Sequence, residues 1–210
     1  MIIRQIPLTD VLTTNAYFYG DEASGHGFLI DPAAEADALL QLIADNHWTI
    51  EKILLTHGHF DHIGAVQKLH EKLGIPYYIE KNGKELLQNP TLNLSAFFGG
   101  DSVLKEAEFL QEGDVLRLNG RTEGGLKVLH TPGHTPDSVV YYDAKNAVAF
   151  VGDTIFKGSV GATHFPLGDD KQLQKSIKNK ILTLPPETIL YSGHSEPTTV
   201  AAEQSNPFID

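Results

Sequence analysis

Three short runs of apolar residues alternate with polar turns at the start of the chain. Residues 2–6, 16–19 and 27–30 are rich in branched and aromatic side chains and have the length of β-strands. The third run enters a turn at Asp31 and Pro32. Three consecutive strands separated only by turns predict a β-meander.

Apolar residues then recur at helical spacing in two segments that alternate with strands. The first predicted helix covers residues 36–43 and is followed by an apolar strand at 53–55. The second helix begins at Asp61, and its inward face is formed by Ile63, Val66, Leu69, His70 and Leu73. A strand at 76–79 follows, which gives the order β-α-β-α-β.

The second half of the chain repeats the order of strands followed by helices. A helix is predicted at 173–181, and the predicted strands are 115–118, 126–129, 139–142, 148–151 and 188–191. Between the halves, residues 81–106 indicate only a short helix near 85–87 and an apolar stretch without a clear period. No linker divides the chain, so we expect one α/β domain over residues 1–210. Two similar halves packed sheet to sheet, with helices outside, make an αββα four-layer sandwich.

Charge and composition exclude several classes of function. The chain has 16 basic and 27 acidic residues and a formal net charge of −11, which argues against nucleic-acid and anionic-membrane partners. Cysteine is absent, so disulfides, thiolate metal ligands and a cysteine nucleophile are excluded. The amino terminus is broken early by Pro7 and does not resemble a signal peptide, and no apolar run is long enough to span a bilayer. We therefore expect a cytoplasmic protein.

Three histidines and an aspartate lie within six positions directly after the strand at 53–55. His57, His59, Asp61 and His62 occupy a strand-to-helix turn, the place where ligands bind at the carboxyl ends of strands. Holding these groups together while partly dehydrated is costly without a cation. His57 and His59 are spaced to share one ion, and Asp61 and His62 to reach a second. The segment therefore predicts metal binding, with zinc preferred and iron or manganese as alternatives.

Three further polar residues follow strands of the second half. His134 lies in a turn held tight by two prolines and a glycine. Asp153 ends a buried strand, where an unpaired carboxylate is costly, and it fits a carboxylate that bridges two ions. His194 follows Gly193, whose lack of a side chain allows close backbone approach. His130, inside a strand, is expected to pack or to form a hydrogen bond rather than to bind metal.

The order of these motifs resembles the metallo-β-lactamase superfamily. Its signature is His-x-His-x-Asp-His, followed by a His in a Pro-Gly-His turn, a Gly-Asp strand end and a late Gly-His. The sequence matches this signature at all seven ligand positions and over essentially the whole chain. Within the superfamily it is most similar to the short glyoxalase II-like hydrolases, through residues 131–136, 152–158, 198–199 and 206–208.

The resemblance implies a ligand set and an activity. His57, His59 and His134 would bind the first metal, with Asp153 bridging; the second metal would be bound by Asp61, His62 and His194. The implied activity is hydrolysis of a small-molecule thioester or ester by a hydroxide that bridges the two ions. Asp61 and Asp153 are the catalytic carboxylates of this assignment, because they set the charge of the centre.

Other residues are candidates for supporting roles. Asp31 and Thr154 are candidates to hold imidazoles by their outer nitrogens. Lys157 and His164 are candidates to line the substrate entrance.

Four positions depart from the short glyoxalase II-like pattern. Ala162 and His164 stand where those proteins usually have Arg and Asp, which removes the usual basic contact for a thiol carboxylate. Asp137 stands where Gly is usual, and we expect it to adopt left-handed backbone, which Asp tolerates better than most residues. Glu196 follows His194 by two residues and places an acid beside the expected cleft.

Alternative functions use the same motifs. A persulfide dioxygenase would hold one ferrous ion with His57, His134 and Asp153, whereas a lactonase or β-lactamase would use both metals and differ in its pocket. A flavodiiron-type redox protein is disfavoured, since it usually has Glu at the position of His59. Metallo-nucleases are disfavoured by the acidic charge. A metal-binding module without catalytic activity is the alternative outside the enzymes.

Overall fold

Two six-stranded β-sheets form the centre of the molecule. The computed structural model describes residues 1–10 and 12–209. The first sheet has the order β1-β2-β3-β4-β5-β6, with strands β1 (Ile2–Leu8), β2 (Thr14–Gly20), β3 (His26–Ile30), β4 (Thr49–Leu54), β5 (Tyr77–Glu80) and β6 (Glu108–Leu110). Strands β1 to β3 pair antiparallel, which confirms the predicted β-meander. Strands β3 to β6 are parallel.

The second sheet is built from the later part of the chain. Its order is β14-β13-β10-β9-β8-β7, with strands β7 (Val115–Leu116), β8 (Leu126–His130), β9 (Val139–Asp143), β10 (Val148–Gly152), β13 (Ile189–Ser192) and β14 (Thr198–Thr199). Only β10 and β13 pair in parallel. The two halves therefore share their layer order but differ in strand direction.

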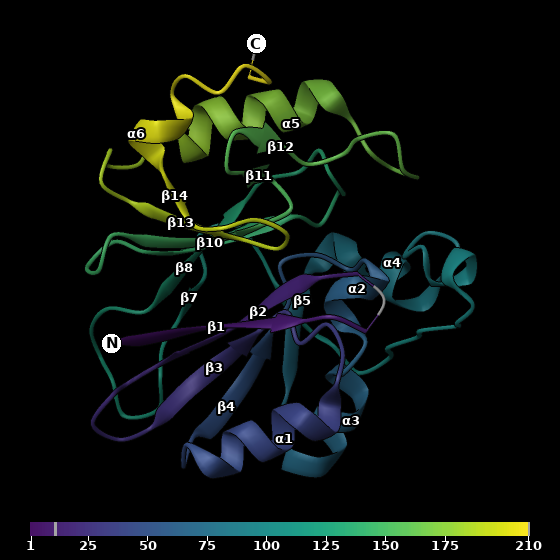
Figure 1. Ribbon diagram of the computed structural model, residues 1–210, viewed down its shortest axis with the longest axis vertical. Coiled ribbons are helices and arrows are strands. Elements are labelled where there is room, and N and C mark those ends of the chain that lie inside the picture. Colours follow the sequence, from purple (N-terminus) through teal and green to yellow (C-terminus); the bar gives the residue numbers. More distant parts are fainter. Residues whose placement is uncertain (11, 210) are drawn as a thin grey trace.

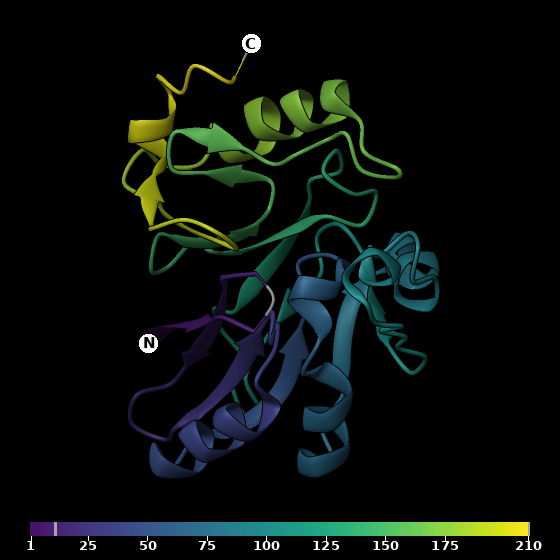
Figure 2. The same ribbon diagram turned by 45° about the vertical axis from the view of Figure 1, so that its right-hand side comes forward.

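Helices cover the outer face of each sheet, as Figures 1 and 2 show. Helices α1 (Ala36–Asp45) and α3 (Val66–Leu73) lie against the first sheet. Helix α5 (Asp170–Ser176), its continuation in the π-helical turn Ile177–Ile181, and α6 (Val200–Glu203) lie on the outer side of the second sheet. The predicted αββα four-layer sandwich is confirmed.

Three separate apolar cores hold these four layers together. In the first, Leu39 and Val66 of the helices pack on the outer face of the first sheet. Tyr17 and Phe28 meet Phe150 between the sheets in the second, and Leu173 packs on the second sheet in the third. Successive strand residues point to opposite faces, so every residue of β2 is buried between a helix layer and the other sheet.

The prediction of a single helix from Asp61 is wrong in one respect. It is divided into α2 (Phe60–Ile63) and α3, with the break at Gly64 and Ala65. At this break the amide of Ala65 donates to the carbonyl of Pro32, and a Cβ on Gly64 would lie 2.3 Å from the carbonyl oxygen of Ala33. Close packing against the loop after β3 therefore interrupts the helix.

Some short elements give little sequence signal. The prediction missed β6, an edge strand of three residues, and the hairpin β11 (Ile155–Phe156) and β12 (Ser159–Val160). The region after β5 folds as η1 (Lys81–Gly83), α4 (Lys84–Gln88) and η2 (Ser95–Phe98). Its buried Leu86 and Leu87 explain the short helical signal.

None of the helices in the described part of the chain has the length and apolar character needed to cross a bilayer.

Candidate metal centre

The predicted cluster residues follow strands whose carboxyl ends meet at one edge of the sandwich. His57, His59, Asp61 and His62 lie after β4, which is parallel to β3. Residues 153 and 194 follow the parallel pair β10 and β13, and residue 134 lies in the loop between β8 and β9. Carboxyl ends of parallel strands point the same way, so loops far apart in the sequence converge here.

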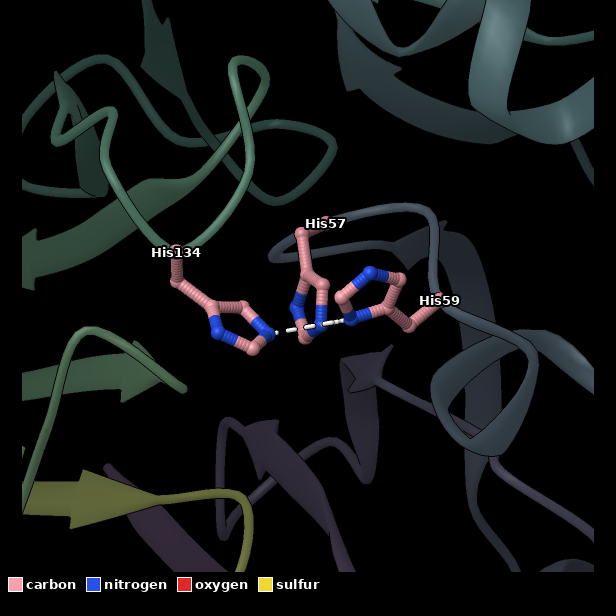
Figure 3. A group of neighbouring side chains, drawn as sticks. All are labelled: His57, His59 and His134. Atoms are coloured by element: carbon pink, nitrogen blue, oxygen red, sulfur yellow. Dashed lines mark hydrogen bonds between the residues drawn. The ribbon is translucent and has the colours of Figure 1, made fainter. Parts of the chain in front are cut away.

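Three imidazoles form the first group of the cluster. The Nδ1 atom of His59 lies 3.1 Å from Nε2 of His57 and 3.0 Å from Nε2 of His134. Figure 3 shows the three rings turned toward one another from two separate loops. A zinc ion bound tetrahedrally to nitrogens at about 2.0–2.1 Å separates them by roughly 3.3 Å, close to the observed spacing.

Hydrogen bonds on the outer side of the rings fix which nitrogen carries the proton. Nδ1 of His134 donates to the carbonyl of Ala162 at 2.7 Å. The hydroxyl of Thr56 donates to Asp31 at 2.6 Å, so it accepts from Nδ1 of His57 at 3.2 Å. The inner Nε2 atoms of both rings are thereby left as lone pairs. Both lone pairs point toward Nδ1 of His59, so a cation at their shared centre would be in reach of all three nitrogens.

The second group consists of Asp61, His62 and His194. Nε2 of His194 lies 3.2 Å from Oδ2 of Asp61, and Nε2 of His62 lies 4.0 Å from the same oxygen. Nδ1 of His62 donates to Asp31 at 2.9 Å, and Nδ1 of His194 donates to the carbonyl of Thr13 at 2.8 Å. In this group too, the inner nitrogens are the ones free to bind a cation.

Asp153 lies between the two groups. Its Oδ2 is 3.7 Å from Nε2 of His134 and 3.3 Å from Nε2 of His194, and its Oδ1 is 3.4 Å from Nε2 of His62. The structure therefore gathers all seven predicted ligand residues, and it places the predicted bridging carboxylate in contact with both groups.

Two further observations fit a cation in this cluster. The inner Nε2 of His62 and Oδ1 of Asp153 are buried without a hydrogen-bond partner among the described residues, an arrangement that is costly unless an ion compensates. A Cβ on Gly193 would lie 2.3 Å from Oδ1 of Asp153 and 2.7 Å from Cε1 of His62. Any side chain at position 193 would displace these ligand atoms, so the predicted close approach of the backbone requires glycine here.

Electrostatics differ between the two groups. Burial and the neighbouring imidazoles lower the pKa of His57 well below its usual value and that of His59 to about 3. These rings are neutral at pH 7, the form in which imidazole binds metal. Although burial opposes it, Asp153 and Asp61 raise the pKa of His194 to about 10. The second group thus attracts positive charge.

The loop that carries His194 is held by the opposite sheet. The hydroxyl of Tyr17 and the amide side chain of Asn15, both on β2, donate to the carbonyl of Ser192 at 2.6 and 3.1 Å. The backbone amide of Asn15 donates to the carbonyl of Gly193 at 2.7 Å. Packing of the two sheets therefore decides where this ligand lies.

Of the two residues predicted to hold imidazoles by their outer nitrogens, Asp31 does so and Thr154 has a different partner. Asp31 holds the outer nitrogen of His62 and also accepts from the amide of Thr56 at 2.8 Å, as a partner of metal-ligating imidazoles does. Thr154 instead pairs its hydroxyl with that of Thr131 at 3.0 Å. His130 forms the expected hydrogen bond, to the carbonyl of Pro136 at 2.8 Å.

A cavity of about 340 Å³ opens over the cluster. Its wall is formed by ligand side chains and by Leu12, Thr13, Phe60, Leu94, Phe98, Phe156, Ala162 and Phe165. Lys157 and His164 do not line it: Lys157 is paired with Glu196 at 2.7 Å, and the exposed His164 ring lies against Phe165. The residues that line the cavity are instead Phe156 and Phe165, each next to one of these candidates in the sequence.

Asp137 corrects another expectation. The residues other than glycine with positive φ in the described chain are Asp31, Glu35, His47, Leu94, Ala147 and Leu167. Asp137 is therefore not in left-handed backbone, and tolerance of that conformation does not explain it. It is fully buried behind the His57–His62 segment, where a Cβ on Gly58 would lie 3.4 Å from its Oδ2.

Replacing Asp137 with Asn should change how stability depends on pH. Burial raises the pKa of Asp137 to about 7, above the ordinary value of 3.8. The folded protein keeps a proton that the unfolded chain releases, so the free energy of unfolding falls as pH rises from about 4 to about 7. Asp137→Asn should remove this loss, which is on the order of 4 kcal/mol at pH 8.

Urea unfolding of both proteins at pH 5 and pH 8 measures this effect. The difference between variant and wild type should grow in the variant's favour at pH 8. The exposed Asp101, changed to Asn in the same way, is the control and should leave the pH dependence unaltered. If the free energy of unfolding depended on pH in the same way for Asp137→Asn and wild type, ionisation of this carboxyl would not destabilise the folded protein, and the prediction would be wrong.

Comparison with known proteins covers the whole cluster. The metallo-β-lactamase superfamily model matches residues 9–194. Hydroxyacylglutathione hydrolase GloC of Haemophilus influenzae is 35% identical over 214 residues, covering 100% of this chain and 99% of GloC. The crystal structure of BLEG-1 B3 metallo-β-lactamase has a TM-score of 0.91 at 38% identity and covers 99% of both chains. That of TTHA1623 in a di-iron-bound form has a TM-score of 0.86 at 37% identity, covering 98% of this chain and 99% of the other.

Proposed function

This chain belongs to the metallo-β-lactamase superfamily, and from that premise we propose that it is a hydrolase that uses two divalent metal ions to cleave small-molecule thioesters. The first ion is assigned to His57, His59 and His134, and the second to Asp61, His62 and His194. Asp153 is assigned to both. Zinc suits the nitrogen-rich first group, and the di-iron form of a similar protein supports iron as an alternative.

The observation that carries this proposal is the position of Asp153. Its two oxygens lie within 3.7 Å of imidazole nitrogens from both groups, so the groups share one carboxylate. A single-metal site would need only one group. Here Asp61, His62 and His194 form a second set whose ligand atoms lie within 4.8 Å of one another.

The chemistry divides between the ions and the protein. Two bound divalent ions would lower the pKa of a water molecule toward about 7, so that hydroxide is available as the nucleophile, and would polarise the carbonyl under attack. Asp31 and the carbonyls of Thr13 and Ala162 hold the imidazoles in one orientation, so the ligand atoms are set before substrate arrives. The chain has no cysteine to form an acyl-enzyme, in keeping with direct attack by water.

Thioesters are preferred over other substrates for two reasons. GloC, similar over the full length, is named as a hydrolase of a thioester of glutathione. A leaving thiolate also needs little protonation, and apart from the ligand side chains the cavity wall offers Thr13 as its one polar residue among the described ones. The similarity to a B3 metallo-β-lactamase keeps β-lactams and lactones as the comparison substrates.

The test is a hydrolysis assay on protein of known metal content. Protein loaded with zinc, iron or manganese should cleave thioesters faster than lactones or β-lactams, should lose that activity after chelation, and should regain it with metal. Oxygen consumption with a persulfide, supported by one iron per chain, would instead establish the dioxygenase alternative. Loaded protein inert toward every thioester would contradict the proposal.

A further inference from the structure

Apart from the ligand groups and Thr13, the cavity over the cluster is lined by apolar side chains. Phe165 lies 6.0 Å from the ring of His59, and Phe156 lies 6.0 Å from the ring of His194, so an aromatic side chain stands beside each group. Phe60 and Phe98 stack at 4.5 Å to form a further wall. These four rings therefore form part of the wall around the ligand atoms.

Exposed apolar side chains extend this wall to the rim. Leu12 and Phe98 are 43% and 50% exposed although both line the cavity. Large apolar side chains left in water beside a cavity gain most when a bound molecule covers them. The cavity is thus suited to an apolar group that extends outward from the cluster.

Beyond the cluster, the part of the chain that the structure describes gives this cavity no cationic side chain to pair with a carboxylate. No Lys or Arg is among the described residues that line it. The nearby Lys157 is exposed and paired with Glu196. The adjoining hollow, which shares Phe60 and Phe98 with the cavity, is lined by Asp10 and Glu35 and again by no Lys or Arg of the described chain. A carboxylate that gives up water there would find no Lys or Arg of the described lining to offset the loss.

We propose that the substrate is a thioester with an apolar acyl group of several carbons and a leaving thiol that carries no carboxylate. This inference rests on the proposed thioester hydrolysis and makes it narrower. Water adds its oxygen to the acyl carbon, the carbon–sulfur bond breaks, and the two hydrogens of water end on the carboxylic acid and the thiol. Glutathione, which carries two carboxylates, is a poor leaving thiol for this cavity.

Four thioesters separate the two parts of the inference: acetyl and hexanoyl groups, each on N-acetylcysteamine and on glutathione. On either thiol, kcat/KM for hexanoyl should exceed that for acetyl by at least about tenfold, because the added methylenes are buried among the rings. For either acyl group, the uncharged N-acetylcysteamine thioester should exceed the glutathione thioester by about tenfold or more.

Variants assign these preferences to the cavity wall. Phe165→Ala should lower the hexanoyl-to-acetyl ratio by on the order of tenfold, whereas Phe109→Ala, an exposed phenylalanine outside the cavity, should leave it unchanged. Ala162→Arg should raise the ratio of glutathione to N-acetylcysteamine thioester, and Ala162→Gln should not. Ratios measured on one variant cancel any loss of metal.

The outcomes are distinguishable. Metal-loaded protein that cleaves none of the four compounds contradicts thioester hydrolysis itself. Cleavage of glutathione thioesters as fast as the uncharged ones, or of acetyl as fast as hexanoyl, overturns the substrate inference and leaves the proposed hydrolase intact.

Discussion

Asp153→Ala should lose metal and hydrolysis together, with kcat/KM falling on the order of a thousandfold, the scale of a lost electrostatic contact in an active site. Asp153 is the one carboxylate of the described cluster that contacts imidazoles of both groups, at 3.3 to 3.7 Å. Without it, the inner nitrogens of five imidazoles remain, with one carboxylate fewer to balance two cations. Metal content by mass spectrometry and thioester turnover on the same preparation measure both effects.

A second variant separates charge from shape at this position. Asp153→Asn keeps the size of the side chain but removes its negative charge, so it should also lose the greater part of its metal. Circular dichroism of both variants after chelation checks that the fold survives. Full metal content with wild-type turnover in Asp153→Ala would contradict the bridging assignment.

Gly193→Ala should remove one of the two ions and lower turnover about a hundredfold, the cost of misplacing catalytic atoms by about 1 Å. The added methyl would lie 2.3 Å from Oδ1 of Asp153 and 2.7 Å from Cε1 of His62, so at least one of them must move. The three atoms nearest to this methyl belong to Asp153 and His62, and none of them to an imidazole of the first group. Metal content should therefore fall from two equivalents to one rather than to none.

Gly100→Ala is the matched control. A Cβ there would meet nothing within 4 Å, and Gly100 is not among the glycines with positive φ. This variant should keep both ions. Two ions in Gly193→Ala as well would show that the ligand atoms do not need the space that glycine leaves.

The layer order and most strands were predictable from the pattern of apolar residues. Buried strands such as β2 and β10 carry continuous apolar runs, and α1 carries a clear helical period. The break between α2 and α3 was not predictable. It depends on the approach of Gly64 to Ala33, a contact between segments that local periodicity does not record.

The members of the cluster were predictable because each follows a strand whose carboxyl end faces the same edge. Their metal-binding roles remain predictions. Most of the groups that orient the ligand imidazoles could not be predicted from the sequence. Thr13 and Ala162 act through backbone carbonyls, which every residue carries. The prediction for the cavity lining was off by one residue in each of two loops. Phe156 and Phe165 line the cavity, whereas the predicted Lys157 and His164, next to them in the sequence, do not. Which side chain of a loop turns inward depends on tertiary packing.

Seven side chains are proposed to hold two divalent ions around Asp153. Anomalous diffraction from crystals of the metal-loaded protein, recorded at the absorption edge of the bound metal, tests this assignment most directly. Two peaks are expected on either side of Asp153, one among His57, His59 and His134 and the other among Asp61, His62 and His194. A single peak, or none within reach of Asp153, would contradict it.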